Sequence, residues 1–332
     1  MSTVSHTQLY KFSSFENAKS ILESCALWSK SPLSFNDPFE MLPSLDEERK
    51  NMVVKSRREF SRLLGLGNAF DLTASGEEEK IPVEDFVDFS AHFHDDILSA
   101  WYPAYSVVCF SEVVDEILLW SHYADAHRGI AIGFDWDKGS VPRGRFPNGL
   151  KVKYVPDRSE LMLPIDFYRF RALDLLDGSR WPEGYRKLAD GSFFSAKQEK
   201  AVQMEGLYSL LCQKFEAWKH EQERRFIYDH QIAEDDLPFS GTDSEGWGRR
   251  VVHFQPENVT EIVFGYRCTD EEIQSYEGVL KKYPHAKLRY VDFHPTEYKV
   301  RLHEGSWEQI LTAHAMRFTS FRSVKKREPE EA

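Results

Sequence analysis

Short apolar runs recur along this chain, and they constrain its fold more than any other feature. Each run is rich in β-branched or aromatic side chains, is too short to form a helix, and lies between segments rich in Gly, Pro or charge. These properties are typical of β-strands. We predict strands at residues 9–12, 27–29, 106–110, 130–134, 151–155, 224–228, 250–254, 261–266 and 288–293.

Helices are predicted between some of these strands. Ser13 and Glu16 have the spacing of a capping box, which predicts a helix start, and Thr269 and Glu272 repeat that spacing. A further helix is expected from about 115 to 126, and a long one from 195 to about 218, whose apolar stripe includes Phe215 and Trp218. Because strands and helices do not alternate regularly, we predict an α+β fold built on a mixed sheet.

The 332 residues are enough for about two domains. The motifs described below nevertheless follow one another from the first predicted strand to the last, which favours one domain. We therefore predict a single α+β domain over 1–304, with a helical insertion at about 41–104 and an irregular insertion at about 137–195. A C-terminal helix and a charged tail are expected at 305–332.

Charge and cysteine content exclude several classes of protein. Lys and Arg number 42 against 54 Asp and Glu, and this net charge of −12 argues against general coating of nucleic acid. No apolar run approaches the roughly 18 residues of a membrane span, so no membrane association is expected. The four cysteines lie far apart without metal-ligand spacing, namely Cys25, Cys109, Cys212 and Cys268. This pattern is typical of free thiols in a reducing cytosol, and we expect a cytoplasmic protein.

Four segments concentrate polar groups in apolar surroundings: LYKF, SFNDPFE, WSHYADAH and WKHEQERR. Each has an ordinary structural interpretation. Lys11 can reach solvent from an edge strand, and Asn36 and Asp37 can be turn residues. Trp120 with Tyr123 can pack against the core, and the residues Glu221, Glu223 and Arg224 can form a charged turn. Taken together, the segments supply the candidate site residues, which are Lys11, Asn36, Asp37, Trp120, His122, Tyr123, Glu221, Glu223 and Arg224.

The histidines do not predict a metal site. His122 and His127 are five residues apart, which is not the i, i+4 spacing that places two imidazoles on one face of a helix. A metal-dependent nuclease or hydrolase that uses Asp37, Glu40 and His122 stays a weaker alternative, because these residues do not have a recognised ligand spacing. No metal is therefore expected.

Glu221 and Glu223 lie two residues apart at the start of a predicted strand, so their side chains are expected to point the same way. Such a pair can hold and polarise a ribose hydroxyl. It can also stabilise an oxocarbenium-like transition state, as paired carboxylates do in glycoside cleavage.

The order of these segments resembles a known bacterial family. The runs LYKF, ALWSKSPLSFNDPFE, VVCFSE, LLWSHYADAHRGIAIGFD, KVKYV, FEAWKHEQERRF and PENVTEIVFGYRC together resemble the family catalogued as domain of unknown function 2971. The resemblance spans roughly residues 9–290, and SFNDPFE and WSHYADAHRG are its most specific parts.

The opening pattern of aromatic strand, capped helix and short strand beginning Leu-Trp is similar to the start of NAD-dependent ADP-ribosyltransferases. This resemblance implies a split mixed sheet and NAD as substrate. It matches Lys11 to the NAD contact on the first strand, Ser29 and Ser31 to the second strand, and the turn 221–223 to the catalytic turn, with Glu223 as its carboxylate. Lysine stands where that superfamily has His or Arg, and Ser-Lys-Ser replaces its usual triplet.

The leading prediction is thus an enzyme that breaks the nicotinamide–ribose bond of NAD and transfers ADP-ribose to an unidentified acceptor or to water. Glu223 would bind the ribose hydroxyl, Glu221 would activate the acceptor, and Lys11 would hold the pyrophosphate or ribose. An aromatic wall is expected from Trp28 and Tyr123, polar pocket contacts from His122 and Asn36, and a locally basic character from Arg224 and Arg225.

A second prediction keeps the pocket without the reaction. In this alternative the chain is a non-catalytic module that senses a nucleotide or small metabolite, and the insertion at 41–104 transmits binding to a partner. For the enzyme, the resemblance implies a role as a toxin or phage-defence effector.

Overall fold

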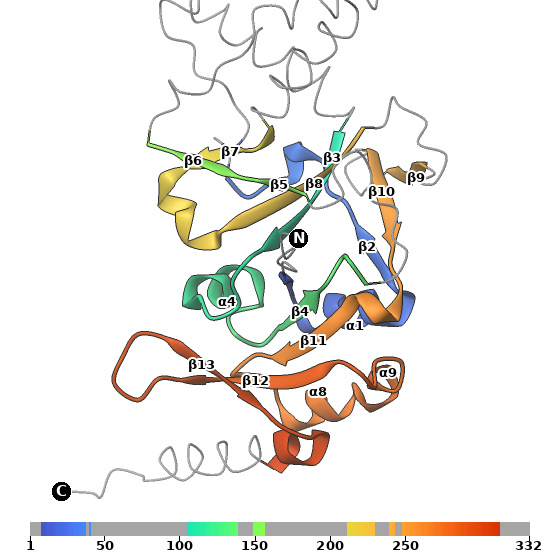
Figure 1. Ribbon diagram of the computed structural model, residues 1–332, viewed down its shortest axis with the longest axis vertical. Helices are drawn as coiled ribbons and strands as arrows, with labels where there is room; N and C mark the ends of the chain where they lie inside the picture. Colours follow the sequence, from blue (N-terminus) through green and yellow to red (C-terminus); the bar gives the residue numbers. More distant parts are fainter. Residues whose placement is uncertain are drawn as a thin grey trace, which may run out of the picture. The chain divides into compact units, whose positions relative to one another are not determined.

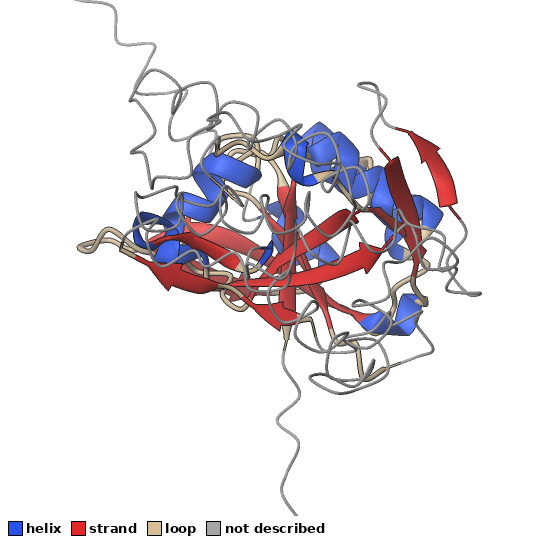
Figure 2. Ribbon diagram, turned by 90° about the horizontal axis from the view of Figure 1, so that it is seen from above, coloured by secondary structure: helices blue, strands red, loops and turns tan. Residues whose placement is uncertain are grey.

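The computed structural model describes residues 8–37, 40, 105–138, 149–156, 211–229, 239–242 and 248–312. In this part of the chain, strands and helices are both present and strands predominate (Figure 2). The largest assembly is an eight-stranded sheet that contains both antiparallel and parallel pairs. The fold class is therefore α+β, as predicted.

The chain divides into two compact units. Unit 1 comprises Met1–Ser34, Pro103–Val152 and Trp218–Ala332, and unit 2 comprises Phe35–Tyr102 and Lys153–Ala217. Unit 2 includes most of the predicted helical insertion at 41–104 and the later part of the predicted irregular insertion at 137–195. Residues 41–104 and 157–195 lie outside the described residues, and the assignment of 1–304 to a single domain stays a prediction.

Unit 1 is built on the eight-stranded sheet (Figure 1). Its strands lie in the spatial order β13 (Val300–Glu304), β12 (Lys287–Phe293), β11 (Val259–Phe264), β4 (Ile130–Phe134), β1 (Leu9–Ser13), β3 (Tyr105–Ser111), β8 (Glu223–Asp229) and β5 (Leu150–Lys151). Only the β11–β12 pair of this sheet is parallel. A second sheet of unit 1 has the order β2 (Ala26–Trp28), β10 (Gly248–His253), β9 (Phe239–Thr242).

Helices cover both faces of the eight-stranded sheet, so its central strands are apolar on both sides. Alternate residues of β1 show this. Leu9 packs in a hydrophobic cluster that includes residues of α1 (Phe15–Ser24), α8 (Asp270–Gln274) and α9 (Glu277–Leu280). Tyr10 and Phe12 instead pack in the cluster of α4 (Ile117–Tyr123). The central strand β4 is buried along its whole length.

In unit 2, β6 (Lys153–Val155) pairs in parallel with β7 (Gln213–Phe215). Lys214 lies 3.5 Å from a carboxylate oxygen of Glu40, and both side chains are buried. Burial of a charge is costly unless an opposite charge compensates it, so this ion pair satisfies two groups that would otherwise oppose folding.

The predicted strands are confirmed with one exception, and their ends agree within two residues. The exception is the run at 151–155, which is divided at Val152: β5 pairs with β8, whereas β6 pairs with β7. Within the described ranges, three strands were not predicted, namely β7, β9 and β13. In β13 only Val300 is buried, so this edge strand lacks the strong apolar pattern on which the predictions depend.

The predicted helix starts have different outcomes. Thr269 and Glu272 form the predicted capping box at α8. The predicted capping box at Ser13 is wrong, because Ser13 belongs to β1 and pairs with Ile130. Helix α1 begins after Ser14, and no side chain caps its first turn. The long helix from 195 does not continue to 218, because 213–215 forms a strand and 216–221 a 3-10 helix; residues 195–210 lie outside the described residues.

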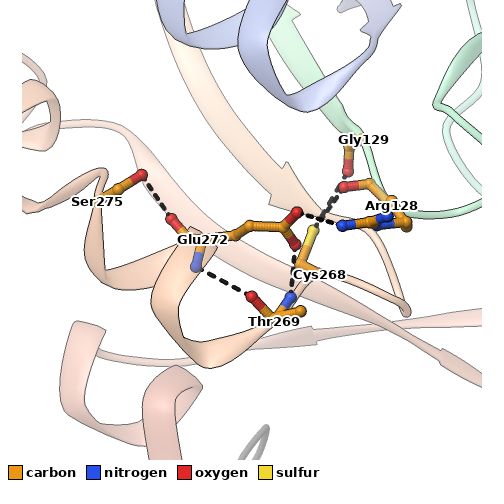
Figure 3. A network of polar contacts seen from close by, with 6 residues as sticks. All are labelled: Arg128, Gly129, Cys268, Thr269, Glu272 and Ser275. Carbon is orange, nitrogen blue, oxygen red and sulfur yellow. Dashed lines mark hydrogen bonds and ion pairs between the residues drawn. The ribbon is translucent and has the colours of Figure 1, made fainter.

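Figure 3 shows how the α8 capping box is tied to the turn after α4. Glu272 receives hydrogen bonds from the backbone of Thr269 at 2.7 Å and from the guanidinium of Arg128 at 2.6 Å. The Thr269 hydroxyl accepts from the backbone of Glu272 at 3.1 Å. Beside them, the buried thiol of Cys268 donates to the backbone carbonyl of Arg128 at 2.9 Å.

Replacement of Thr269 by alanine should lower the free energy of unfolding by about 0.5–2 kcal/mol, because it removes the acceptor of an otherwise unpaired helix N–H. Thr269→Ser retains that acceptor and serves as the control. Urea denaturation of both variants measures the difference. Equal stability of the alanine and serine variants would contradict the role of the cap.

The turn after α4 is strained. Asp125, Ala126 and His127 have positive φ angles of 46°, 49° and 72°, and left-handed backbone costs on the order of 1–2 kcal/mol for each non-glycine residue. The turn is held by backbone hydrogen bonds to the segment after β11, where a Cβ on Gly265 would lie only 2.3 Å from the carbonyl oxygen of His127. A glycine at 265 is therefore required for this close approach.

Candidate functional site

Strands β1 and β3 separate soon after they meet. Among the described residues, they pair only where Tyr10 lies opposite Ser111. Four residues earlier on β3, Val107 pairs instead with Lys30, which follows β2. Two different segments thus flank the same edge of β3, and Cys109 lies between their two points of contact. We call this region the strand fork, defined by Lys11, Lys30, Cys109 and Ser111.

Lys11 extends across the strand fork. Its side chain is half-buried, and its ammonium donates to the carbonyl oxygen of Cys109 at 3.0 Å. Burial is the main cause that lowers the pKa of Lys11, and the charge of Lys30 lowers it further, whereas Cys109 and Glu223 act to raise it. The negative charge of Glu223 is the smallest of these four influences, and the hydrogen bond of the Lys11 ammonium is to Cys109.

Glu223 is held in place by Arg225. The guanidinium donates to both carboxylate oxygens, at 2.8 Å and 3.0 Å, and Arg225 is completely buried while Glu223 is 6% exposed. Burial lowers the pKa of Arg225 to about 9, so the guanidinium remains charged at neutral pH and favours the ionised carboxylate. The result is a carboxylate of fixed orientation at the first residue of β8.

The other carboxylate of the turn is fixed separately. Glu221 is buried, and it accepts a 2.6 Å hydrogen bond from the hydroxyl of Tyr123 on α4. Ser111 donates to the backbone carbonyl of Glu221 at 2.6 Å, and Gln222 between the two glutamates has a positive φ of 44°. The sequence therefore forms an ordered turn, which we call the E-x-E turn (residues 221–223).

Arg224 points to a different group of charges. It donates to Glu112, which also receives a hydrogen bond from Lys151 at 3.1 Å. Partial burial acts to raise the pKa of Glu112, but the hydrogen bonds from Arg224 and Lys151 outweigh it and lower the pKa. Arg224 thus stabilises the edge of the sheet beside the E-x-E turn.

His122 is exposed on α4 and makes aromatic contacts with its neighbours. Its ring centroid lies 5.9 Å from that of Trp218 and 6.2 Å from that of Tyr123. Tyr123 in turn binds Glu221, so His122 and Trp218 border the E-x-E turn. Trp218 was predicted only as part of a helical stripe, and no sequence pattern indicated its contact with His122.

Other predicted site residues have structural roles in unit 1. Trp120 is completely buried, donates to the carbonyl of Val114 at 2.7 Å and packs against Phe12. Ser29 donates to Ser106, which lies five residues before Ser111 and so roughly 17 Å from it along the strand.

The two remaining residues of this region do not reach the E-x-E turn through any described contact. Ser31 accepts from the backbone of Leu33 at 3.3 Å in a local turn. Trp28 is 44% exposed and belongs to β2, opposite Val251 of β10. The structure therefore brings Tyr123, Glu221 and Glu223 together at the E-x-E turn, with His122 and Arg224 beside it, while Lys11 contacts Cys109 in the strand fork.

Asn36, Asp37 and Glu40 belong to unit 2. Asn36 is exposed, and the backbone of Glu40 donates to the carbonyl of Asp37 at 3.1 Å. Within the described part of the chain, no group of three or more His, Cys, Asp or Glu side chains is arranged to hold a metal ion. The carboxylate of Glu40 is instead paired with Lys214.

A surface hollow of about 620 Å³ lies at the opposite edge of the eight-stranded sheet from β8, and its lining includes Lys287, Glu304 and Gln309. Its lysine and glutamate pair with each other at 3.5 Å. The hollow contains none of the predicted site residues, so we base the functional argument on the strand fork and the E-x-E turn.

Comparison of the chain with family models, with curated proteins and with solved structures gave no match. Among the helices of the described ranges, none is long and apolar enough to span a membrane.

Proposed function

We propose that this chain is an ADP-ribosyltransferase-like enzyme that cleaves the nicotinamide–ribose bond of NAD. The observation that carries the proposal is the E-x-E turn, in which two buried carboxylates are held individually, by Tyr123 and by Arg225. The negative charge of its second carboxylate also favours the charged form of Lys11. The split mixed sheet that the resemblance implies is part of this proposal; among the described residues, β1 and β3 share the single pair Tyr10–Ser111.

In the proposed reaction, the bond from nicotinamide to the ribose C1′ atom breaks, and its electron pair leaves with neutral nicotinamide. Positive charge then develops on the ribose ring. Glu223 accepts a hydrogen bond from the ribose 2′-hydroxyl and stabilises this charge. A fixed charge stabilises a transition state better than one that must reorient, because no reorganisation is required during the reaction. Arg225 provides that fixation.

Glu221 takes the proton of the incoming nucleophile in this scheme. The oxygen of water, or of a hydroxyl or amide acceptor, forms the new bond to C1′, and its proton passes to the carboxylate. The 2.6 Å hydrogen bond from Tyr123 holds Glu221 in one orientation. The products are nicotinamide and either free or transferred ADP-ribose.

Lys11 is suited to bind the pyrophosphate. An ammonium has three donors, and Cys109 takes one of them at 3.0 Å. An anion in the strand fork would also counteract the burial that lowers the pKa of Lys11. The neighbouring Lys30 adds positive charge to the same region.

We expect Lys11→Met to raise the KM for NAD by about 10-fold or more, since loss of a charged hydrogen bond costs roughly 1.5–3 kcal/mol, while kcat changes less. Lys151→Met is the matched control, because Lys151 is an exposed lysine that pairs with Glu112 outside the strand fork. Initial rates over a range of NAD concentrations separate the two constants. An unchanged KM in Lys11→Met would remove this lysine from the proposed site.

The proposal is tested by incubating the full-length protein with NAD, with and without a mixture of macromolecular acceptors, and measuring free nicotinamide. Nicotinamide that accumulates in proportion to protein supports the enzyme. Saturable NAD binding by calorimetry without any release would support the sensing module instead. Cleavage of nucleic acid only after addition of a divalent metal would support the metal-dependent alternative.

A further inference from the structure

Ser121 and His127 form a second polar arrangement in unit 1, apart from the E-x-E turn. The hydroxyl oxygen of Ser121 lies 2.9 Å from the Nε2 atom of His127. Ser121 is exposed on α4, whereas His127 is 9% exposed. An accessible hydroxyl is thus in contact with a largely buried imidazole, which is the arrangement of a nucleophile and its general base.

The imidazole is held by the strained turn after α4. Asp125, Ala126 and His127 are all left-handed, and the backbone N–H of His127 donates to the carbonyl of Trp120 at 3.0 Å. Three successive residues in this conformation place His127 beside the exposed side of α4. An observed strain of this kind is a reason to look for a function at the site.

The surroundings favour the neutral form of His127. Burial lowers its pKa, and the nearby positive charge of Arg267 lowers it further. The group that faces the ring from β12 is the apolar Phe293, with centroids 6.1 Å apart, and the group from α4 is the uncharged Ser121. An imidazole that stays neutral can accept the proton of a hydroxyl at neutral pH.

The Nδ1 atom of His127 is buried and has no hydrogen-bond partner among the described residues. A base at Nε2 requires the proton to be on Nδ1, and no third residue of the described ranges fixes this tautomer. The arrangement is therefore a dyad, and its reaction is expected to be slower than that of a triad.

We infer that Ser121 is an activated serine that accepts acyl groups from carboxylic esters. Its hydroxyl oxygen attacks the ester carbonyl carbon and forms the new C–O bond, while its proton passes to Nε2 of His127. The bond from that carbon to the leaving alkoxide or phenolate breaks, and the leaving group departs with the electron pair. Phe293, which is exposed and packs against Tyr266 with centroids 4.1 Å apart, offers an apolar surface for the acyl chain.

Two other serines provide an internal control. Ser24 and Ser275 are exposed, and each donates to a carbonyl of its own helix region, at 2.7 Å and 2.8 Å. The Ser121 hydroxyl has one proton, which it donates either to such a carbonyl, that of Ile117 at 3.2 Å, or to Nε2 of His127. Of these three serines, Ser121 is the one with an imidazole contact, so differences among them in one molecule report that contact and not the folding of a variant.

The experiment treats the full-length protein with p-nitrophenyl acetate and locates acetyl groups by peptide mass spectrometry. We expect Ser121 to be acetylated at least about 10-fold faster than Ser24 and Ser275. His127→Asn should reduce acetylation of Ser121 by about 100-fold, which is the lower range for general base catalysis; asparagine is chosen because it tolerates the left-handed backbone. The rate should fall at low pH with a midpoint below that of an ordinary histidine.

Equal acetylation of the three serines, or unchanged acetylation in His127→Asn with an unchanged melting temperature, would overturn the inference. Glu223→Gln separates this site from the proposed NAD reaction, because Ser121 should still be acetylated in that variant. Loss of acetylation in Glu223→Gln with an intact fold would also contradict an independent site.

Discussion

Arg225→Met is expected to lower the free energy of unfolding by about 3–5 kcal/mol, because it leaves the Glu223 carboxylate buried without its opposite charge. The guanidinium is completely buried and binds both oxygens of Glu223. A charge that loses such a partner must be protonated or become hydrated, and both processes oppose the native packing. Denaturation in guanidinium chloride, with circular dichroism as the signal, measures the effect.

Two further variants test whether the lost charge pair causes the loss of stability in Arg225→Met. Arg128→Met removes the arginine of the Arg128–Glu272 ion pair, in which the Arg128 side chain is 51% exposed. This variant should lower the free energy of unfolding by no more than about 1 kcal/mol. The double variant Glu223→Leu/Arg225→Met removes both charges and should regain most of the stability lost in Arg225→Met. A cost for Arg225→Met as small as that for Arg128→Met would contradict a buried pair.

Glu223→Gln is expected to lower kcat for nicotinamide release by about 10²–10³-fold, the usual effect of removing one group that stabilises transition-state charge. The amide retains the size of the side chain but has no negative charge to oppose the charge of the ribose ring. Because the substrate ground state carries no such charge on the ribose, KM should change less than kcat. Steady-state rates of nicotinamide formation provide both constants.

Glu261→Gln is the matched control for Glu223→Gln. Glu261 belongs to β11 of the same sheet, is 5% exposed and pairs with Arg289 at 3.1 Å. The two substitutions thus remove the same charge from carboxylates of similar burial at different places in the sheet. Comparable losses of kcat in both variants, after correction for folded protein, would indicate a general effect on the fold and not a role for Glu223.

The sheet of unit 1 could be predicted from the sequence because burial on both faces makes its strands apolar without interruption. Residues 130–134 show this, since all five are buried and the predicted bounds match β4. Edge strands lack this signal, as β13 shows. The separation of β5 from β6 at Val152 could not be predicted, because the two strands form one continuous apolar and basic run in the sequence. They are separated by their partners, since β5 pairs with β8 and β6 pairs with β7, and both partners come from a later part of the chain.

The candidate site could be predicted in part. The E-x-E spacing before a strand indicated Glu221 and Glu223, and the lysine between two aromatic residues indicated Lys11. The position of Glu223 relative to β1 depends on the register of β1, β3 and β8, which pairs Ser111 with both Tyr10 and Glu223. Such a register is set by contacts between distant segments, and it has no local signature in the sequence.

Two features of this region have physical causes that the sequence does not show. The importance of Arg225 was not predicted, because β8 is buried on both faces from Arg225 to Tyr228 and the sequence does not show that a guanidinium there is paired with Glu223. Trp120 was considered as a pocket residue because it lies in a polar segment. Its indole N–H is satisfied by the carbonyl of Val114, which allows complete burial.

The central claim is that NAD is cleaved at the strand fork through the charge of Glu223. Its most direct test mixes the wild-type protein, in excess, with NAD and measures free nicotinamide within a single turnover, with Glu223→Gln in parallel. We predict nearly complete conversion of NAD to nicotinamide by the wild type and little by the variant. Recovery of intact NAD from both proteins, after calorimetry has shown that both bind it, would contradict the account.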